Sequence, residues 1–265
     1  MTLLMIGAGN MGGAMLRRWL EAGMPARDVT VVSPSGRAMP DGVRVVSAVP
    51  DAGEGGYDVI LLGLKPQQLA TLRDGPLAGH APTLLVSILA GVEEATLAPL
   101  CRATVVARAM PNLPVGIGKG VVALHAARAD AAARATLDAL MRPLGLVEWI
   151  DDEVQFDAVT ALAGCGPGFV FRFADALAQA GAAIGLPADQ AARLALATLE
   201  GAAIMAATAD APPRVLADRV ASPGGSTRRG LDVLDRPDGL VALLTETLTA
   251  SARRNREMAA EARAG

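Results

Sequence analysis

The chain has 265 residues, of which 52% are hydrophobic, 19% charged and only 3% aromatic, and its formal net charge is −3. This length supports one large domain or two smaller ones, and the charge gives no reason to expect nucleic acid or an anionic membrane as partner. The start, Met1 to Leu4, has no basic segment, so we expect no secretory signal. Cys101 and Cys165 build no disulfide framework, which is typical of a cytoplasmic protein.

Rare residue types restrict the chemistry of the second half, because no His, Lys or Tyr follows His125. Catalysis there must use carboxylates, hydroxyls, arginine, backbone amides or water. A Tyr-x-x-x-Lys dehydrogenase is excluded, since Leu61 stands four places after Tyr57, the only tyrosine. A serine hydrolase of the Gly-x-Ser-x-Gly type is excluded as well, and the Cys and His residues lack zinc-site spacing, so we expect no metal.

Short apolar runs alternate with helical stretches over the first 150 residues. Such runs predict the buried strands of a parallel sheet that is covered on both faces. They are Leu3–Ile6, Val29–Val32, Val43–Val46, Val59–Leu62, Leu84–Ile88 and Thr104–Ala107, with Gly120–Leu124 and Leu146–Ile150 expected to close the sheet.

From Asp151 onward the pattern changes to long Ala- and Leu-rich helical segments. We therefore predict an α/β fold class, with a doubly wound sheet in residues 1–152 and an all-α domain in residues 153–265. The helical segments between Phe156 and Ala206 carry too few polar residues for one buried face. We expect them to be buried against a second copy of the chain.

A glycine motif follows the first predicted strand. Gly7-Ala8-Gly9-Asn10-Met11-Gly12 lies between that strand and a helix expected over Met11 to Ala22. There the first glycine permits a tight turn, the second lets the backbone approach a pyrophosphate, and the third lets helix and strand pack closely. The helix start also favours an anion. The motif predicts a Rossmann-type dinucleotide-binding domain, and the alternative is an ordinary strand–helix turn.

The end of the second predicted strand indicates which cofactor is used. An acidic residue there would bind the ribose of NAD, but this chain has Ser33-Pro34-Ser35-Gly36-Arg37. Hydroxyls and a guanidinium favour NADPH, with NADH as the second choice; the other interpretation is a solvated loop in which Arg37 touches nothing. Lys65 follows the fourth predicted strand, where it could contact the cofactor or cap the strand, and local chemistry leaves both open.

One motif of the helical half points to a ligand, namely Ser222-Pro223-Gly224-Gly225-Ser226-Thr227. Ser222 suits a helix cap and Pro223 a first helical turn. A small carboxylate fits such a helix start, and Thr227 adds a hydroxyl that donates and accepts. The alternative is a plain helix start. The segment Gly164 to Gly168 is equally open, either a helix break that admits a ligand or a loop between core helices.

Together these motifs resemble the pyrroline-5-carboxylate reductases, NAD(P)H enzymes that complete proline biosynthesis. The resemblance covers essentially the whole chain. It rests on Gly7 to Gly12, Leu64 to Gln67, Ser87 to Gly91, Arg108 to Pro114, Asp157 to Leu162, Gly164 to Gly168, Gly185 to Pro187 and Ser222 to Thr227. It implies a helical dimerisation domain, a homodimer that in some members builds decamers, and an active site shared between the Rossmann crevice of one chain and the helices of the other.

The motifs and the resemblance also imply residue roles. Cofactor contacts fall on Ile6, Gly7, Ala8, Gly9, Asn10, Met11, Gly12, Ser33, Arg37, Gly63, Leu64, Lys65, Pro66, Ile88, Ala90, Met110 and Asn112. Substrate contacts fall on Glu153, Ser222, Gly224, Gly225, Ser226 and Thr227, with Thr227 as the catalytic polar contact.

Four positions depart from the family's usual residues. Ala163 and Cys165 lack two common serine hydroxyls, Phe169 lacks a phenol, and Arg219 replaces a small polar residue. A related reductase of another cyclic imine acid is therefore an alternative. A β-hydroxyacid dehydrogenase would need a lysine in the helical domain, and none follows Lys119. A non-catalytic NADP sensor would not need the turn at Ser222 to Thr227.

Overall fold

The computed structural model describes residues 1–54, 56–72 and 75–264, so that Gly265, the last residue of the predicted second domain, lies outside the described residues. The chain forms two compact units. The first comprises Met1–Cys165 and Ser251–Gly265, and the second comprises Gly166–Ala250.

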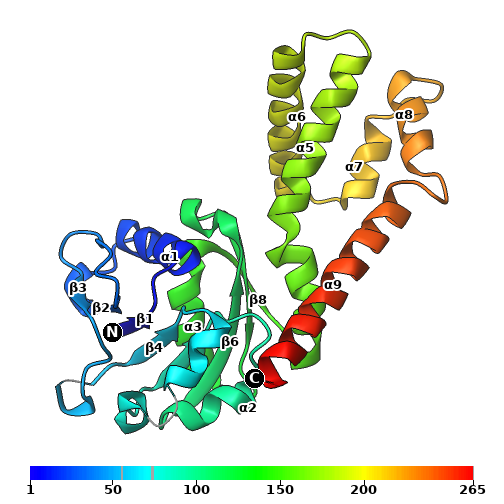
Figure 1. Ribbon diagram of the computed structural model, residues 1–265. Helices are drawn as coiled ribbons and strands as arrows, with labels where there is room; N and C mark the ends of the chain where they lie inside the picture. Colours follow the sequence, from blue (N-terminus) through cyan, green and yellow to red (C-terminus); the bar gives the residue numbers. More distant parts are fainter. Residues whose placement is uncertain (55, 73–74, 265) are drawn as a thin grey trace. The chain divides into compact units, whose positions relative to one another are not determined.

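The first unit is built on a sheet with the strand order β3-β2-β1-β4-β5-β6-β7-β8 over the described residues (Figure 1). The strands are β1 (Leu3–Ile6), β2 (Val29–Val32), β3 (Arg44–Val46), β4 (Val59–Leu62), β5 (Leu84–Ser87), β6 (Val105–Pro111), β7 (Gly120–His125) and β8 (Gly145–Trp149). Strands β1 to β6 pair with one another in parallel, as the apolar runs predict. The doubly wound order makes β1 an interior strand, between β2 and β4.

Strand β7 departs from the prediction of a parallel sheet, because it is antiparallel to β6. Only residues 112–119 connect the two strands, and a parallel return needs a crossover of a dozen or more residues. Strand β6 is also longer than the predicted Thr104–Ala107, since it continues to Pro111. The extension exists because β7 pairs with it, with Arg108 opposite His125.

Side chains alternate between the two faces of the sheet and build two hydrophobic clusters. Leu3 and Met5 belong to one cluster, while Leu4 and Ile6 belong to the other. The first cluster contains residues of α1 (Asn10–Glu21) and α3 (Ala131–Met141), and the second contains Leu97 of α2 (Glu94–Leu97). Both faces of the sheet are therefore covered, as expected for a mainly parallel sheet.

Helix α1 buries one face against the sheet, including Met15, Leu16 and Trp19. The indole Nε1 of Trp19 donates a hydrogen bond to the carbonyl oxygen of Leu140, 2.6 Å away, which ties α1 to α3. After β8 the chain forms α4 (Phe156–Val159) and a π-helical turn over Thr160–Gly164. Phe156 and Ala161 are buried, so residues just beyond the predicted boundary at 152/153 pack with the first unit.

The second unit is helical. It contains α5 (Gly166–Ala183), α6 (Ala188–Thr208), α7 (Pro213–Arg219), α8 (Ser226–Leu234) and the first part of α9 (Leu240–Ala264). The helices are interrupted near Gly185, at Pro212 and between Val220 and Gly225, close to the breaks that glycine and proline predict. The segment Gly164 to Gly168 is not an open loop, because only Cys165 separates the π-helical turn from α5.

Candidate functional site

The predicted cofactor residues gather at one edge of the sheet. They lie at or just after the carboxyl ends of β1, β2, β4, β5 and β6, which are adjacent parallel strands. Ligands of open α/β sheets bind outside these strand ends, where the strand order reverses. The reversal here lies between β1 and β4, the strands followed by Gly7 and by Gly63.

The motif after β1 contains three glycines, and a Cβ atom would meet different surroundings at each of them. Gly7 has φ +87°, and a Cβ there would lie 3.0 Å from the backbone of Gly63. A Cβ on Gly12 would lie 3.2 Å from the carbonyl oxygen of Gly7. A Cβ on Gly9, by contrast, would meet no atom of the described residues within 4 Å, and Gly9 has ordinary extended backbone angles. Packing against protein atoms explains Gly7 and Gly12, whereas no contact with a described residue requires a glycine at position 9.

The start of α1 is suited to an anion. Its N-cap, Gly9, provides no side-chain hydrogen bond, and the first turn carries no acidic residue. The first N–H groups of such a helix lack partners within the helix, and the helix dipole attracts negative charge. The loop and the helix start thus fit the pyrophosphate of a dinucleotide.

The loop after β2 carries no carboxylate. Ser33 is buried, and its backbone N–H donates to the carbonyl oxygen of Val46 at 2.8 Å, which fixes the end of the strand. Gly36 has φ +64° and its N–H donates to the carbonyl oxygen of Ser33. Arg37 is exposed on this turn. After β4, Lys65 is also exposed, and its backbone N–H is held by the Gln68 side chain at 3.1 Å.

Asn112 at the end of β6 has a structural task that the sequence did not indicate. Its Nδ2 donates to the carbonyl oxygen of Ala163 at 3.0 Å, and its Oδ1 accepts from the backbone N–H of Val121 at 2.8 Å. Its side chain therefore joins the β6 end to the start of β7 and to the π-helical turn. Met110 packs beside it in a small cluster with Ala123 and Phe156.

Glu153, predicted as a substrate contact, forms a bridge inside the first unit. Its Oε1 accepts from Arg108 Nη1 at 2.9 Å and from the backbone N–H of Glu94, also at 2.9 Å. The Arg108 side chain is only 6% exposed, and its guanidinium lies 4.3 Å from the centre of the Phe156 ring. Glu153 thus connects the middle of β6 to the segment that follows Ile88 and Ala90.

A half-buried acid, Glu94, and a buried imidazole, His125, extend this network. His125 Nδ1 lies 2.7 Å from the carbonyl oxygen of Ile150, so Nδ1 carries the proton that is donated there. His125 Nε2 lies 3.5 Å from Glu94 Oε1. The two side chains form an ion pair only if the imidazole is protonated. Burial raises the pKa of Glu94, against the opposing effect of the Ala127 N–H that it accepts.

A cavity of ≈ 410 Å³ lies beside this network, lined by Gly91, Arg108, Glu153, Phe156 and Asp157 among others. It borders the segment after β5 that is predicted to line the cofactor. Arg108, Glu94 and His125 had no role in the sequence prediction. Their partners are distant in sequence: the pairing of β6 with β7 places Arg108 opposite His125, and Glu94 joins them from α2.

The predicted substrate turn lies in the second unit, where Gly224 has φ +73° and the N–H of Gly225 donates to the carbonyl oxygen of Ser222 at 2.9 Å. The expected helix start at Ser222 and Pro223 is wrong, because these residues form a turn and α8 begins only at Ser226. Gly225 is the N-cap without a side-chain hydrogen bond, and a Cβ there would lie 2.6 Å from Ser222 Oγ. The first N–H groups of α8 therefore have no side-chain cap, and Thr227 beside them is exposed.

Cys165 and Ser251 show how one of the unusual positions is accommodated. Ser251 Oγ donates to Cys165 Sγ at 3.4 Å, and the backbone N–H of Cys165 donates to Thr160. The thiol thus contacts a serine hydroxyl at the end of the π-helical turn.

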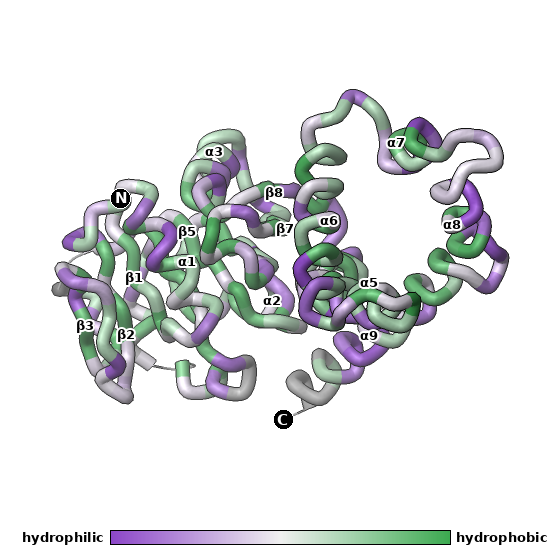
Figure 2. The backbone as a smooth tube through the Cα atoms, turned by 90° about the horizontal axis from the view of Figure 1, so that it is seen from above, coloured by the Kyte–Doolittle hydropathy of each residue, from purple (hydrophilic) through white to green (hydrophobic). Residues whose placement is uncertain are grey.

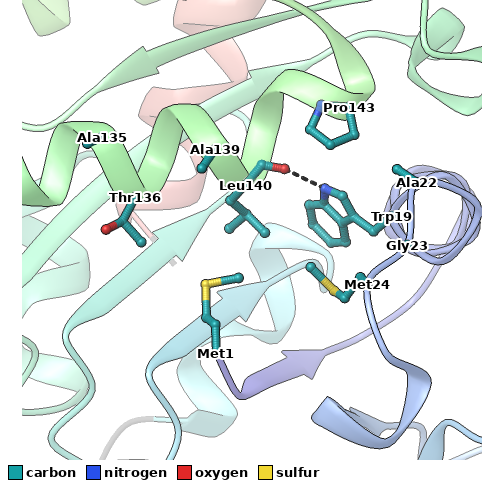
Figure 3. A pocket seen from close by; sticks show the side chains of 10 residues that line it. All are labelled: Met1, Trp19, Ala22, Gly23, Met24, Ala135, Thr136, Ala139, Leu140 and Pro143. Carbon is teal, nitrogen blue, oxygen red and sulfur yellow. Dashed lines mark hydrogen bonds between the residues drawn. The ribbon is translucent and has the colours of Figure 1, made fainter.

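A further depression of ≈ 530 Å³ lies between α1 and α3 and is lined mainly by apolar side chains (Figure 3). Met1, Met24 and Leu140 border it, and the Trp19 N–H is already bonded to Leu140. No ionisable side chain is found among the described residues that line it. It lies near the amino end of β1 and offers no chemistry for a reaction.

Helices α5 and α6 expose large apolar side chains. Phe171 is 60% exposed, Leu196 64% and Met205 67%, and Figure 2 shows long hydrophobic stretches on both helices. By length and composition, the helical stretches Glu153–Ala183 and Ala188–Thr208 could cross a membrane. Patches of this kind also mark protein–protein interfaces.

The fold and the edge site define an oxidoreductase class with a dinucleotide-binding unit and a helical unit. Residues 153–258 match the family model for pyrroline-5-carboxylate reductase dimerisation, and residues 2–91 match that for NADP oxidoreductase, coenzyme F420-dependent. Dimerisation therefore explains the apolar surface of α5 and α6.

Comparison with whole proteins agrees. The pyrroline-5-carboxylate reductase of Pseudomonas aeruginosa is 35% identical over 261 residues, covering 96% of this chain and 95% of the relative. That of Pisum sativum is 35% identical, covering 97% and 96%. A Coxiella burnetii reductase structure has a TM-score of 0.85 at 28% identity, covering 97% of both chains. A Plasmodium falciparum pyrroline carboxylate reductase with NADP bound has a TM-score of 0.80 at 24% identity, covering 97% and 98%. The chain belongs to the pyrroline-5-carboxylate reductase family.

Proposed function

We propose that this chain reduces the C=N bond of 1-pyrroline-5-carboxylate to L-proline with NADPH, the last step of proline biosynthesis. The observation that carries the proposal is the turn Ser222 to Gly225 with the uncapped helix start at Ser226, in a chain that aligns over 96% of its length with a pyrroline-5-carboxylate reductase. A protein that only senses NADP would not need this turn.

The cofactor would be held at the carboxyl edge of the sheet. Gly7 to Gly12 would bind the pyrophosphate, and Ser33 and Arg37 would lie at the adenosine 2′-phosphate. Gly63 to Pro66, Ile88 and Ala90 would line the remainder, with Met110 and Asn112 near the nicotinamide. Bound NADPH supplies a hydride to the imine carbon. Because no carboxylate stands at Ser33 to Arg37, we infer that NADPH is preferred over NADH.

The substrate would be held by the turn before α8. Ser222, Gly224 and Gly225 shape the turn, and the N–H groups of Ser226 and Thr227 would bind the carboxylate. The Thr227 hydroxyl would orient the ring nitrogen or pass it a proton from water. An iminium carbon is already electrophilic, so the site needs orientation rather than a strong general acid. This agrees with the absence of His, Lys and Tyr after His125.

For Glu153 we infer an indirect role. Since its Oε1 accepts from both Arg108 and the Glu94 N–H, it would hold the segment after β5 in place. Its other carboxylate oxygen remains for the neighbouring cavity, where the family match expects a contact near the substrate.

We further infer that the enzyme acts as a cytoplasmic homodimer. The apolar faces of α5 and α6 and the match to the dimerisation family support the dimer. Hydride transfer needs the nicotinamide and the imine carbon in contact, so the two sites must work together in the assembled enzyme.

The test is NADPH oxidation by the purified protein with 1-pyrroline-5-carboxylate and, in parallel, with its six-membered homologue. We expect a higher kcat/KM for the five-membered ring. A clear preference for the six-membered ring would identify a related imine reductase, and no oxidation with either imine would refute the proposal.

A further inference from the structure

Arg228, the residue after Thr227, is held by three carboxylates. Its Nη1 lies 3.1 Å from Asp218 Oδ1, its Nε 3.0 Å from Asp232 Oδ1 and its Nη2 2.9 Å from Asp235 Oδ2. Each guanidinium nitrogen thus donates to a different aspartate. The Arg228 side chain is 28% exposed, so the guanidinium is partly shielded from solvent, whereas the three aspartates are more exposed.

These four charges oppose the preferences of their own helices. Arg228 stands in the first turn of α8, where the helix dipole disfavours a cation, and Asp218 stands in the last turn of α7, where it disfavours an anion. Asp232 and Asp235 lie near the end of α8, again the unfavourable end for acids. A basic residue four places before an acid is also the weaker order for a helical pair. Local helix energetics therefore do not explain the cluster.

The ion pair between Arg228 and Asp218 explains the cluster, because this pair spans the proposed substrate turn. Asp218 belongs to α7 and Arg228 to α8, and the segment between the helices contains Ser222 to Gly225. The ion pair fixes the end of α7 against the start of α8. Asp232 and Asp235 then hold the guanidinium from its other sides.

We propose that Arg228 is a positioning residue that fixes the turn Ser222 to Thr227, and that it does not itself bind the substrate carboxylate. This inference rests on the proposed assignment of the turn as the substrate site. A basic side chain beside such a turn would ordinarily be expected to bind the carboxylate directly. Here each guanidinium nitrogen already donates to an aspartate, and the three carboxylates around the cation would repel a substrate carboxylate, while the first N–H groups of α8 have no side-chain cap.

The two roles of Arg228 make opposite predictions for Asp218→Ala. If Arg228 positions the turn, removing Asp218 loosens it, and kcat/KM for the imine acid falls about tenfold, chiefly through KM, since misplacement by about 1 Å can cost up to 10²-fold. If Arg228 binds the carboxylate, removing Asp218 frees a cation and KM falls. Asp218 is 58% exposed, so the variant is expected to fold.

Further variants locate the effect. Asp235→Ala removes a contact within α8 and its C-cap only, and should cost less than Asp218→Ala. Arg228→Lys cannot donate to three carboxylates in a planar fork, and should not restore the wild-type kcat/KM. The matched control is Arg229→Met, because Arg229 is 79% exposed and its ion pair with Asp232 is long, at 3.7 Å. Its kcat/KM should stay within about twofold of wild type, as for an exposed pair.

The deciding experiment combines steady-state kinetics with amide hydrogen exchange on the full-length protein. We expect faster exchange of the amides of residues 222–228 in Asp218→Ala and Arg228→Met but not in Arg229→Met, with NADPH affinity unchanged in all three. Exchange does not depend on turnover, so it tests the role of Arg228 even if the wild type failed to reduce the imine. Unchanged exchange in Asp218→Ala, a lower KM in that variant, or full rescue by Arg228→Lys would overturn the inference.

Discussion

Gly7 and Gly63 touch backbone to backbone at the carboxyl edge of the sheet, so closely that a Cβ on Gly63 would lie 2.7 Å from the carbonyl oxygen of Gly7. The loops after β1 and β4 are joined here, since the N–H of Gly63 also donates to the carbonyl oxygen of Ile6 at 2.9 Å. Both loops border the point where the strand order reverses. The spacing between them is therefore set by two residues without side chains.

Alanine substitutions should distinguish a glycine needed for packing from one needed for the proposed ligand. Gly63→Ala should lower the free energy of unfolding by about 1–3 kcal/mol, the usual cost of overpacking. Gly9→Ala meets no described protein atom and should change stability by less than about 0.5 kcal/mol. It should nevertheless weaken NADPH binding about tenfold or more, equivalent to about 1.4 kcal/mol. Thermal unfolding and fluorescence titration with NADPH measure the two effects. Unchanged NADPH affinity in Gly9→Ala would show that no ligand approaches this residue.

Cofactor preference should depend on the loop after β2. Ser33→Asp adds a carboxylate where the 2′-phosphate of NADPH is proposed to lie, so like-charge repulsion should lower kcat/KM with NADPH about tenfold or more. Activity with NADH should be retained, because a carboxylate can bind the ribose hydroxyls. The comparison is kcat/KM for both cofactors in wild type and variant. A wild type that used only NADH would contradict the interpretation of Ser33 and Arg37.

Glu153 should stabilise the segment after β5 that is proposed to line the cofactor. Glu153→Ala removes two hydrogen bonds and leaves the buried Arg108 without its carboxylate, at a cost of about 1.5–3 kcal/mol in unfolding free energy. NADPH affinity should fall with it, because the Glu94 N–H loses its acceptor. Glu153→Gln keeps an acceptor oxygen and should show a smaller loss of both. If the alanine variant raised only the KM for the imine acid, Glu153 would be a direct substrate contact instead.

The pH dependence of stability should change in Glu94→Gln. Burial raises the pKa of Glu94 above its ordinary value of 4.5, so above pH 4.5 the folded state binds more protons than the unfolded state. Stability contributed by this group is then lost as pH rises through the folded pKa. The Ala127 N–H, His125 and Arg108 act against the shift, and Glu153 adds to it.

Glutamine cannot ionise, yet it can accept from Ala127 and donate to His125. The stability of Glu94→Gln relative to wild type should therefore increase as pH rises from 4.5, and should be constant below that pH. Unfolding midpoints measured across this range in both proteins give the comparison. A relative stability that decreased with pH would mean that the pKa of Glu94 is lowered.

The fold could be predicted to the extent that it depends on local pattern. Strands β1 and β4 are buried on both faces, so runs such as Val59–Leu62 are apolar without interruption. The last part of β6 could not be predicted, since Arg108 and Pro111 are unusual in a strand. It is stabilised by pairing with β7, a tertiary effect that no local pattern shows.

The candidate site divides in the same way. The glycine loop was evident because strand, glycines and helix are consecutive in the chain. The bridge from Arg108 through Glu153 to Glu94 joins residues 45 and 59 positions apart. The spacing of four residues between Arg228 and Asp232 is visible in the sequence and is typical of a helical ion pair. The contact of Arg228 with Asp218 depends on how α7 and α8 pack.

Thr227 gives the most direct test of the central claim, that the turn before α8 holds the imine acid for reduction. The measurement is kcat/KM for 1-pyrroline-5-carboxylate in wild type, Thr227→Ala and Thr227→Ser, with NADPH affinity determined in parallel. Thr227→Ala deletes one hydrogen bond to a partly charged group, about 1.5–3 kcal/mol, so kcat/KM should fall about ten- to a hundredfold. Thr227→Ser should keep most of the activity, and NADPH affinity should hardly change in either variant. An alanine variant within about twofold of wild type would show that Thr227 only begins a helix.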